Sequence, residues 1–173
     1  MNTFLTSNYL SLMNAFKHHS DARVDKLPSI YPKHSTSLLA EYCTLRLDGG
    51  RQSGKSVATT HFAADWLMDG GTVIVLSDKS SYARITADRI KKRMKEFGYS
   101  DNHLLISNSV RSYVGNEAHF LRGRSLTRIL YIIDEPMKVD MGKIYEVHQK
   151  TVWPSMLGQG VDKQSLFFVI GMQ

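Results

Sequence analysis

A short glycine-rich segment constrains the fold of this chain more than any other feature. It reads Gly49, Gly50, Arg51, Gln52, Ser53, Gly54, Lys55 and Ser56. This order fits the pattern G-x-x-x-x-G-K-[ST], in which glycines let backbone N–H groups converge on phosphate oxygens. A strand-like segment, residues 42–47, precedes it, and residues 57–68, of helical composition, follow. Strand and helix flank the pattern as phosphate binding requires, so we expect a phosphate loop at residues 49–56 rather than a glycine turn before an ordinary helix.

The residue types of the phosphate loop predict its ligands. Lys55 is expected to bridge the β- and γ-phosphates of ATP, and the Ser56 hydroxyl is expected to ligate Mg²⁺. The N-terminus of the helix that begins near Lys55 adds a partial positive charge. All eight residues of the loop are therefore candidate nucleotide-binding residues, with ATP and Mg²⁺ as the cofactors.

A second motif is an apolar strand that ends in two acids. Residues 129–133 read Ile-Leu-Tyr-Ile-Ile, and Asp134 and Glu135 follow directly. Asp134 is expected to hold the Mg²⁺ shell, and Glu135 to orient and deprotonate an attacking water. Two solvated acids at a strand end are the alternative interpretation, which the phosphate loop in the same chain disfavours. Glu after Asp favours hydrolysis of ATP by water over phosphoryl transfer to a small acceptor.

Strand-like and helix-like segments alternate along the chain. The predicted strands are 42–47, 72–76, 103–107, 129–133 and 166–170, and the predicted helices are 1–24, 57–68, 82–97 and 143–156. Residues 108–127 are predicted to be irregular, with a hairpin considered, and Pro154 is expected to limit the last helix. The alternation predicts an α/β fold, a mainly parallel sheet of five or more strands flanked by helices. Two predicted strands lie between the motif strands in sequence. We therefore expect at least one strand between the motif strands in the sheet, as in RecA-like (ASCE) or helicase-like P-loop NTPases and unlike adenylate kinase.

The 173 residues are expected to form one main domain with an N-terminal extension. Residues 1–40 are predicted to be a helix and a connector (residues 25–40), and residues 41–173 the nucleotide-binding domain. The helix has a candidate cap in Ser7 and an apolar face of Leu5, Tyr9, Leu12, Met13 and Phe16.

Composition excludes several classes of protein. The single cysteine, Cys43, excludes an internal disulfide framework and a cysteine zinc site and is expected in the core. The longest apolar stretch, residues 166–172, falls far short of the roughly 20 residues that span a bilayer, so no membrane partner is expected. The seven histidines lack paired metal-ligand spacing and are expected at the surface or in the core. Trp66 and Trp153 are expected to anchor helices to the core.

The net charge of +6 comes mainly from residues 81–98, where six basic residues accompany two acidic ones. Candidate contacts to DNA phosphates in and just before this segment are Lys79, Arg84, Lys91, Lys92 and Lys95. A solvated outer helix is the alternative, and it stays open.

The motifs together resemble those of the large terminase subunits of tailed bacteriophages. The resemblance covers about residues 40–173 and rests on the R-Q-x-G-K-S loop at 51–56, the segment Phe-Leu-Arg-Gly-Arg-Ser at 120–125, the acidic strand end at 132–135 and the final strand with residues 168–173. It implies that Arg51 is a cis-acting arginine that stabilises charge on the transferring phosphoryl group, and that Gln52 shapes the nucleotide pocket. It also implies a coupling segment, including Gly171 and Gln173, that senses loss of the γ-phosphate.

The resemblance implies a function as the ATPase of a DNA-packaging motor. Such a motor hydrolyses ATP with Mg²⁺ to move double-stranded viral DNA into a procapsid in the host cytoplasm. The implied partners are double-stranded DNA, further copies of the chain in a homo-oligomeric ring, the portal and the small terminase subunit. Family members continue into a nuclease domain, and no acidic triad for one is recognised here, so no nuclease activity is expected.

Several assignments remain open at this point. Tyr31 and Tyr42 are candidates to pack on adenine, and Arg122, Arg124 and Arg128 are either contributors to a neighbouring copy's site or structural residues. The alternative functions are a helicase-like or other nucleic-acid-dependent ATPase, and a nucleotide-binding interaction module without hydrolysis.

Overall fold

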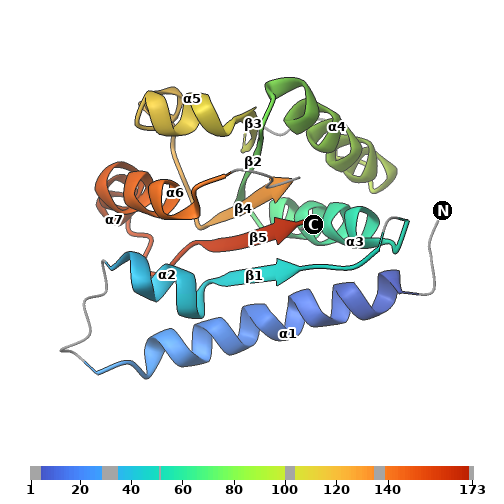
Figure 1. Ribbon diagram of the computed structural model, residues 1–173, viewed down its shortest axis with the longest axis horizontal. Coiled ribbons are helices and arrows are strands. Elements are labelled where there is room, and N and C mark those ends of the chain that lie inside the picture. The colour runs from blue at the N-terminus through green and yellow to red at the C-terminus, as the bar shows by residue number, and fades with distance from the viewer. Residues whose placement is uncertain (1–4, 29–34, 51, 100–103, 135–138, 172–173) are drawn as a thin grey trace.

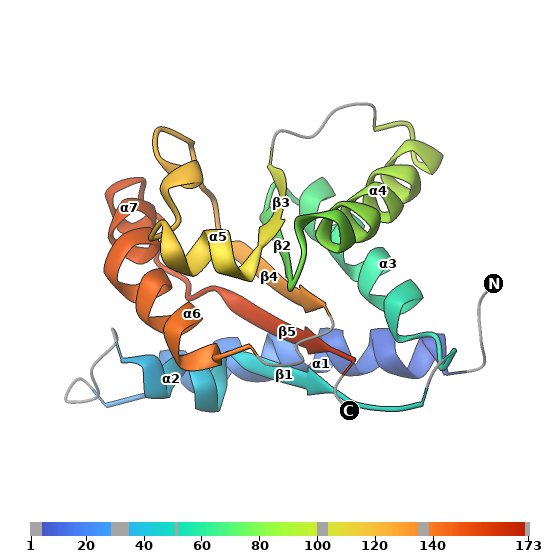
Figure 2. The same cartoon turned by 45° about the horizontal axis from the view of Figure 1, so that its top comes forward.

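The fold is a three-layer α/β arrangement around one parallel sheet (Figures 1 and 2). The computed structural model describes residues 5–28, 35–50, 52–99, 104–134 and 139–171. Its strands are β1 Thr44–Leu47, β2 Thr72–Ser77, β3 Leu105–Ser109, β4 Ile129–Asp134 and β5 Leu166–Ile170. They pair in parallel in the order β1-β5-β4-β2-β3. The predicted α/β fold with a parallel sheet is confirmed.

Helices cover both faces of the sheet. The structure has α1 Thr6–Asp25, α2 Thr36–Tyr42, α3 Lys55–Met68, α4 Ser80–Glu96, α5 Val110–Gly115, α6 Met141–Val147 and α7 Trp153–Gly158. Helices α1, α3 and α4 pack together on one face, and α2, α5, α6 and α7 lie on the other (Figure 1). Strands β2 and β5 are buried along their whole length, which explains their uninterrupted apolar sequences. None of the described helices combines the length and hydropathy that crossing a bilayer requires.

The expectation of a strand between the two motif strands is confirmed, although neither of the two strands that separate the motifs in sequence supplies it, because β2 and β3 lie beyond β4. Strand β5 is the last in the sequence, and it lies between β1, which leads into the phosphate loop, and β4, which ends in Asp134. The register pairs Asp134 with Ile170 and Leu47 with Ile170, so these strand ends lie at one edge of the sheet.

Two short helices occur where the sequence predicted a connector, a strand start or an irregular segment. Helix α2 occupies the end of the predicted connector and the start of the predicted first strand, because the Ser35 side chain accepts a hydrogen bond from the Leu38 N–H at 3.1 Å and caps it. Helix α5 begins in the same way, with Ser109 capping the Ser112 N–H at 3.1 Å. A short 3₁₀-helix, His119–Leu121, follows α5. The prediction of a hairpin within residues 108–127 was therefore wrong.

The first helix also differs in detail from its prediction. It begins at Thr6 after Leu5, and no side-chain hydrogen bond caps it, so the assignment of Ser7 as its cap was wrong. Met13 is buried, whereas Leu5 and Leu12 are 43% and 46% exposed, so the apolar face is narrower than predicted. The buried Met13 belongs to the same hydrophobic core as the sheet.

The last predicted helix is divided in three. A π-helical turn, His148–Val152, separates α6 from α7. Pro154 is the second residue of α7, directly after the π-helical turn, and the helix continues beyond it to Gly158. The expectation that Pro154 limits this helix was therefore wrong. The predicted core positions of Cys43, Trp66 and Trp153 are confirmed.

A polar chain runs through the core beneath the π-helical turn. The Tyr131 hydroxyl lies 3.0 Å from the Tyr113 hydroxyl and 3.0 Å from His148 Nδ1, and its ring stacks on Phe167 with centroids 4.5 Å apart. Burial lowers the pKa of His148 to about 3. His148 is therefore a neutral core residue, whose Nε2 has no hydrogen-bond partner among the described residues.

Candidate functional site

The carboxyl ends of the parallel strands form the edge at which the two sequence motifs meet. The phosphate loop leaves the carboxyl end of β1 and enters α3, and Asp134 closes β4 two strands away. Figure 2 shows β1, β5 and β4 ending on the same side of the molecule. Ligands of open α/β sheets bind at this kind of edge, where connections leave toward opposite faces.

The backbone of the phosphate loop takes conformations that favour glycine. Gly54 has φ +91° and is the N-cap of α3, and its carbonyl accepts from the Ala58 N–H at 3.0 Å. Gln52, directly after the undescribed Arg51, has φ +59°. Left-handed residues at these positions turn the chain sharply into the helix, so that the free N–H groups of the first turn of α3 face the loop.

The Lys55 side chain folds back onto the earlier residues of the phosphate loop. It donates hydrogen bonds to the carbonyl oxygens of Gly49 and Gly50, the latter at 3.0 Å, and to Ser53 Oγ at 3.1 Å. The residue is only 8% exposed. An ammonium group is thus held over the loop by neutral acceptors, which phosphate oxygens, being charged acceptors, can replace.

Tyr9 of α1 contacts the phosphate loop, whereas the sequence predicted only that it lies on the apolar face of the first helix. Its hydroxyl donates to Ser53 Oγ at 3.5 Å. It also lies against Gly49, where a Cβ atom would be 2.6 Å from Tyr9 Oη. No local signal links Tyr9 to residues forty positions later, since the contact depends on how α1 packs along α3.

Asp134 is held by a residue of the neighbouring helix. Thr86 of α4 is buried, and its hydroxyl donates to Asp134 Oδ2. Ser77 of β2 is paired in register with Asp134, and its buried hydroxyl has no hydrogen-bond partner among the described residues. The sequence offered one indirect signal for Thr86, a small polar residue among the charged ones of α4.

These residues fit a nucleoside triphosphate and Mg²⁺. Gly49 has φ +149°, a conformation that residues with side chains rarely adopt, Lys55 supplies a buried cation, and Ser56 is exposed. The described residues contain no cluster of three or more His, Cys, Asp or Glu side chains. Mg²⁺ at phosphates takes one or two protein ligands and completes its shell with phosphate oxygens and water, so Ser56 and Asp134 form a suitable set.

Four of the predicted residues, Arg51, Glu135, Tyr31 and Gln173, lie outside the described residues. Of the predicted coupling segment, Gly171 is described. It has φ +82° directly after β5, and its N–H donates to Leu47 O of β1 at 3.3 Å. Tyr42 ends α2 at the amino end of β1, and the phosphate loop follows the carboxyl end of that strand.

The predicted DNA contacts lie on the surface of the molecule. Lys79, Arg84, Lys91, Lys92 and Lys95 are all exposed. Beside them, a groove of about 440 Å³ runs between α3 and α4. We call it the basic groove; it is lined by Ser56, Val57, Thr60, His61, Arg89, Lys92, Arg93 and Glu96. Of the predicted contacts, only Lys92 lines this groove.

The cations of the basic groove differ in their partners. Arg93 donates to Glu96 at 2.8 Å and lies 4.4 Å from the centre of the Phe97 ring. Partial burial and the nearby Arg93 lower the pKa of His61. Arg89 and Lys92 make no ion pair or hydrogen bond with a described residue. These two side chains are therefore free to meet an anion.

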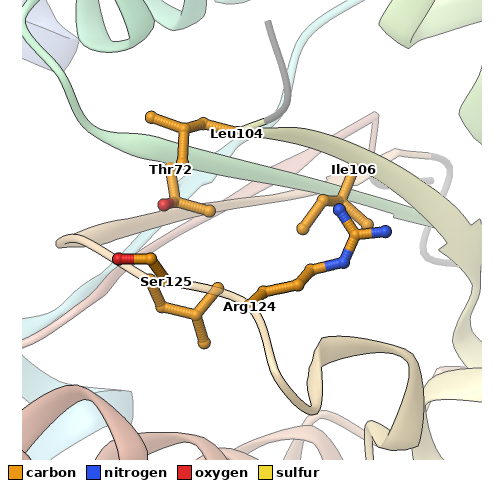
Figure 3. Close-up of a pocket in the computed structure, with 6 residues that line it drawn as sticks. Thr72, Leu104, Ile106, Arg124 and Ser125 are labelled. Atoms are coloured by element: carbon orange, nitrogen blue, oxygen red, sulfur yellow. The ribbon is translucent and has the colours of Figure 1, made fainter. Parts of the chain in front are cut away.

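Two of the three arginines whose role the sequence left open make contacts within the chain at the opposite edge of the sheet. Arg128 pairs with Asp21 of α1, donates to Gln164 O at 2.8 Å and lies 5.2 Å from the Trp66 ring centre, so it is a structural residue. Arg124 donates to Phe120 O at 3.1 Å and extends across a hollow of about 100 Å³ toward Ile106 (Figure 3). Arg122 is exposed.

Comparison with known proteins finds a phage relative and distantly similar structures. The chain is 56% identical over 179 residues to the uncharacterized 25.0 kDa protein in the regB-denV intergenic region of Enterobacteria phage T4, covering all of this chain and 82% of that protein. A mutant large terminase ATPase domain of Thermus phage P74-26 matches with a TM-score of 0.46 and 15% identity, over 75% of this chain and 58% of that chain. No protein-family model matches the chain.

Proposed function

This chain belongs to the same family as the 25.0 kDa phage T4 protein, whose name states no activity, and we propose from the site itself that it is a Mg²⁺-dependent ATPase. The observation that carries the proposal is the phosphate loop between β1 and α3. There Lys55 is buried against the Gly49 and Gly50 carbonyls, and Gly49 has φ +149°, which favours glycine. Asp134 ends β4 at the same edge of the sheet.

Each residue of the site has a defined task. When bound, MgATP supplies the phosphoryl group that water attacks and the metal charge that offsets its phosphates. Lys55 exchanges the carbonyls of Gly49 and Gly50 for phosphate oxygens, while the free N–H groups at the start of α3 face the same anion. Ser56 and Asp134 would hold the metal, and Thr86 fixes one oxygen of the Asp134 carboxylate.

Three further roles complete the proposed reaction. Glu135, directly after Asp134, takes the proton of the attacking water, and Arg51 stabilises charge that develops on the phosphoryl group. Gly171 and Gln173 report loss of the γ-phosphate. The hydrogen bond from Gly171 to Leu47 supports this last role, because it joins the end of β5 to the strand that carries the phosphate loop.

We propose further that this ATPase drives packaging of double-stranded viral DNA in the host cytoplasm. The R-Q-x-G-K-S loop and the segment at 120–125 support this, as do the exposed cations of α4 beside the site. The proposed partners are DNA, other copies in a ring, the portal and the small terminase subunit. In this arrangement residues 41–173 are the motor domain, with α1 packed against α3.

Phosphate release from ATP with Mg²⁺, measured with and without double-stranded DNA, tests the proposal. We expect release that DNA stimulates, and we expect Glu135→Gln to bind ATP without turnover. A Glu135→Gln variant that turns over at the unmodified rate contradicts the role of Glu135. Separation of duplex strands indicates a helicase-like ATPase instead, and ATP binding without any release indicates a non-hydrolysing interaction module.

A further inference from the structure

We propose that Tyr9 of α1 is a positioning residue of the phosphate loop, which it holds through Ser53 and Lys55. The inference rests on the proposed nucleotide site and adds to it a residue from outside the loop motif. Tyr9 lies forty residues before the loop in the sequence, and only the fold brings it there.

The first support is a chain of polar contacts. Tyr9 Oη donates to Ser53 Oγ at 3.5 Å, and Lys55 Nζ donates to the same oxygen at 3.1 Å. Ser53 Oγ therefore accepts from the tyrosine of α1 and from the lysine that is to meet the phosphates. Loss of the tyrosine hydroxyl leaves Ser53 with one restraint fewer.

The second support is the shape of the loop at Gly49. A Cβ atom at this position would lie 2.6 Å from Tyr9 Oη, which is closer than real Cβ contacts. The tyrosine hydroxyl thus occupies the space that a side chain at residue 49 would need. The hydroxyl that lies beside Gly49 is the same one that donates to Ser53, so its path to the loop runs through Ser53.

The third support is that α1 is itself firmly held. Met13 is completely buried, the Phe16 ring meets the Phe168 ring edge-on at 6.2 Å, and Asp21 pairs with Arg128. Lys17 lies 5.1 Å from the Trp66 ring centre. A helix anchored at several points presents Tyr9 at a fixed place, so its hydroxyl restrains the loop rather than following it.

The expected consequence concerns nucleotide affinity more than the chemical step. A loop with fewer restraints must be ordered when phosphates bind, and that ordering weakens binding. Tyr9 contacts Ser53 and lies beside Gly49, which belong to the binding loop, and among the described residues it makes no hydrogen bond to Asp134. Its loss should therefore raise KM and leave kcat nearly unchanged.

The experiment compares the full chain with its Tyr9→Phe variant, which keeps the ring and removes the hydroxyl. We expect the Kd of a fluorescent ATP analogue and the KM for ATP to rise about threefold, near the low end for one neutral hydrogen bond because the 3.5 Å contact is long, with kcat nearly unchanged. Tyr99→Phe is the matched control, because this exposed tyrosine follows the far end of α4, and it should bind as the unmodified chain does.

A double-mutant cycle then tests the path through Ser53. We expect Tyr9→Phe to have no further effect on Kd when Ser53→Ala is already present. An unchanged Kd in Tyr9→Phe alone, or effects of the two substitutions that multiply, overturns the inference. If the unmodified chain binds no ATP analogue, the proposed nucleotide site is wrong, and this inference is wrong with it. If the unmodified chain binds the analogue and Tyr9→Phe binds it equally well, only this inference is wrong.

Discussion

The hydroxyl of Thr86 donates a hydrogen bond to Asp134 Oδ2, which ties the basic helix α4 to the end of β4. One carboxylate oxygen is thereby fixed, and the other is left for a metal. Residues that orient a metal ligand in this way typically contribute about 10- to 100-fold to metal affinity or activity.

We therefore predict that Thr86→Val raises the Mg²⁺ concentration for half-maximal ATP hydrolysis by about tenfold. Valine keeps the shape of threonine and removes its hydroxyl. Thr86→Ser, which retains the hydroxyl, should respond to Mg²⁺ nearly as the unmodified chain does. Equal Mg²⁺ requirements for the valine and serine variants contradict the role of Thr86.

The basic groove offers a matched test of DNA contact. We predict that Arg89→Ala with Lys92→Ala weakens duplex binding more than Arg84→Ala with Lys95→Ala, because the first pair lines a groove and the second lies on the open helix face. Both pairs remove one arginine and one lysine from α4. Loss of two phosphate contacts should reduce the slope of log K against log salt by about 1.8.

Binding of a labelled duplex across a salt series measures this difference. Equal losses for the two pairs mean that α4 attracts DNA diffusely and that the groove has no special part. Unchanged binding in both variants means that α4 is a solvated outer helix.

Ser77 and Ser109 are neighbours in the register of β2 and β3, yet their hydroxyls have opposite roles. Ser77 Oγ is buried without a partner among the described residues, whereas Ser109 Oγ caps α5. We predict that Ser77→Ala raises the free energy of unfolding by about 1 kcal/mol, since it removes an unsatisfied polar group. Ser109→Ala should lower it by about 1 kcal/mol through loss of the cap. Urea unfolding measures both, and destabilisation by Ser77→Ala contradicts this account of Ser77.

The buried His148 makes the free energy of unfolding depend on pH. Its pKa is about 3 in the folded chain because burial disfavours its charged form, and an unfolded histidine titrates near 6.5. Between these values the unfolded state binds a proton that the folded state does not, so this contribution to stability is lost as the pH falls from 6.5 toward 3.

The measurement is the urea midpoint of the unmodified chain and of His148→Gln between pH 7 and 5. We expect a shallower fall for the glutamine variant, which cannot titrate but can still accept from Tyr131. Parallel pH profiles for the two proteins contradict the assignment of His148 as a neutral core residue.

The sequence predicted the parts of the fold that depend on local pattern. Residues 166–170 form β5 as expected, because an uninterrupted apolar run of this length suits a strand buried on both faces. The motif from Gly49 to Ser56 correctly predicted a strand, a loop and a helix in succession, because few backbone conformations accommodate that glycine spacing. The short helices α2 and α5 were missed although Ser35 and Ser109 were available as capping signals.

The rest of the site depends on contacts between distant segments. Tyr9 meets Ser53, and Thr86 meets Asp134, across 44 and 48 residues of sequence. Neither pair has a spacing that a helix or strand period could reveal. The basic groove likewise arises from two helices, so the charge run of α4 predicted exposed cations without indicating that Arg89 and Ser56 line the same groove.

Calorimetric titration of the full chain with MgATP, beside its Lys55→Ala variant, tests the central claim most directly. Lys55 is the buried cation of the phosphate loop, and its removal leaves the carbonyls of Gly49 and Gly50 without their donor. We predict saturable binding of one ATP per chain and a loss of at least about tenfold in affinity for Lys55→Ala, the scale of a charge-assisted hydrogen bond. Absence of binding to the unmodified chain, or equal affinity for both proteins, would contradict the assignment of residues 49–56 as a nucleotide site.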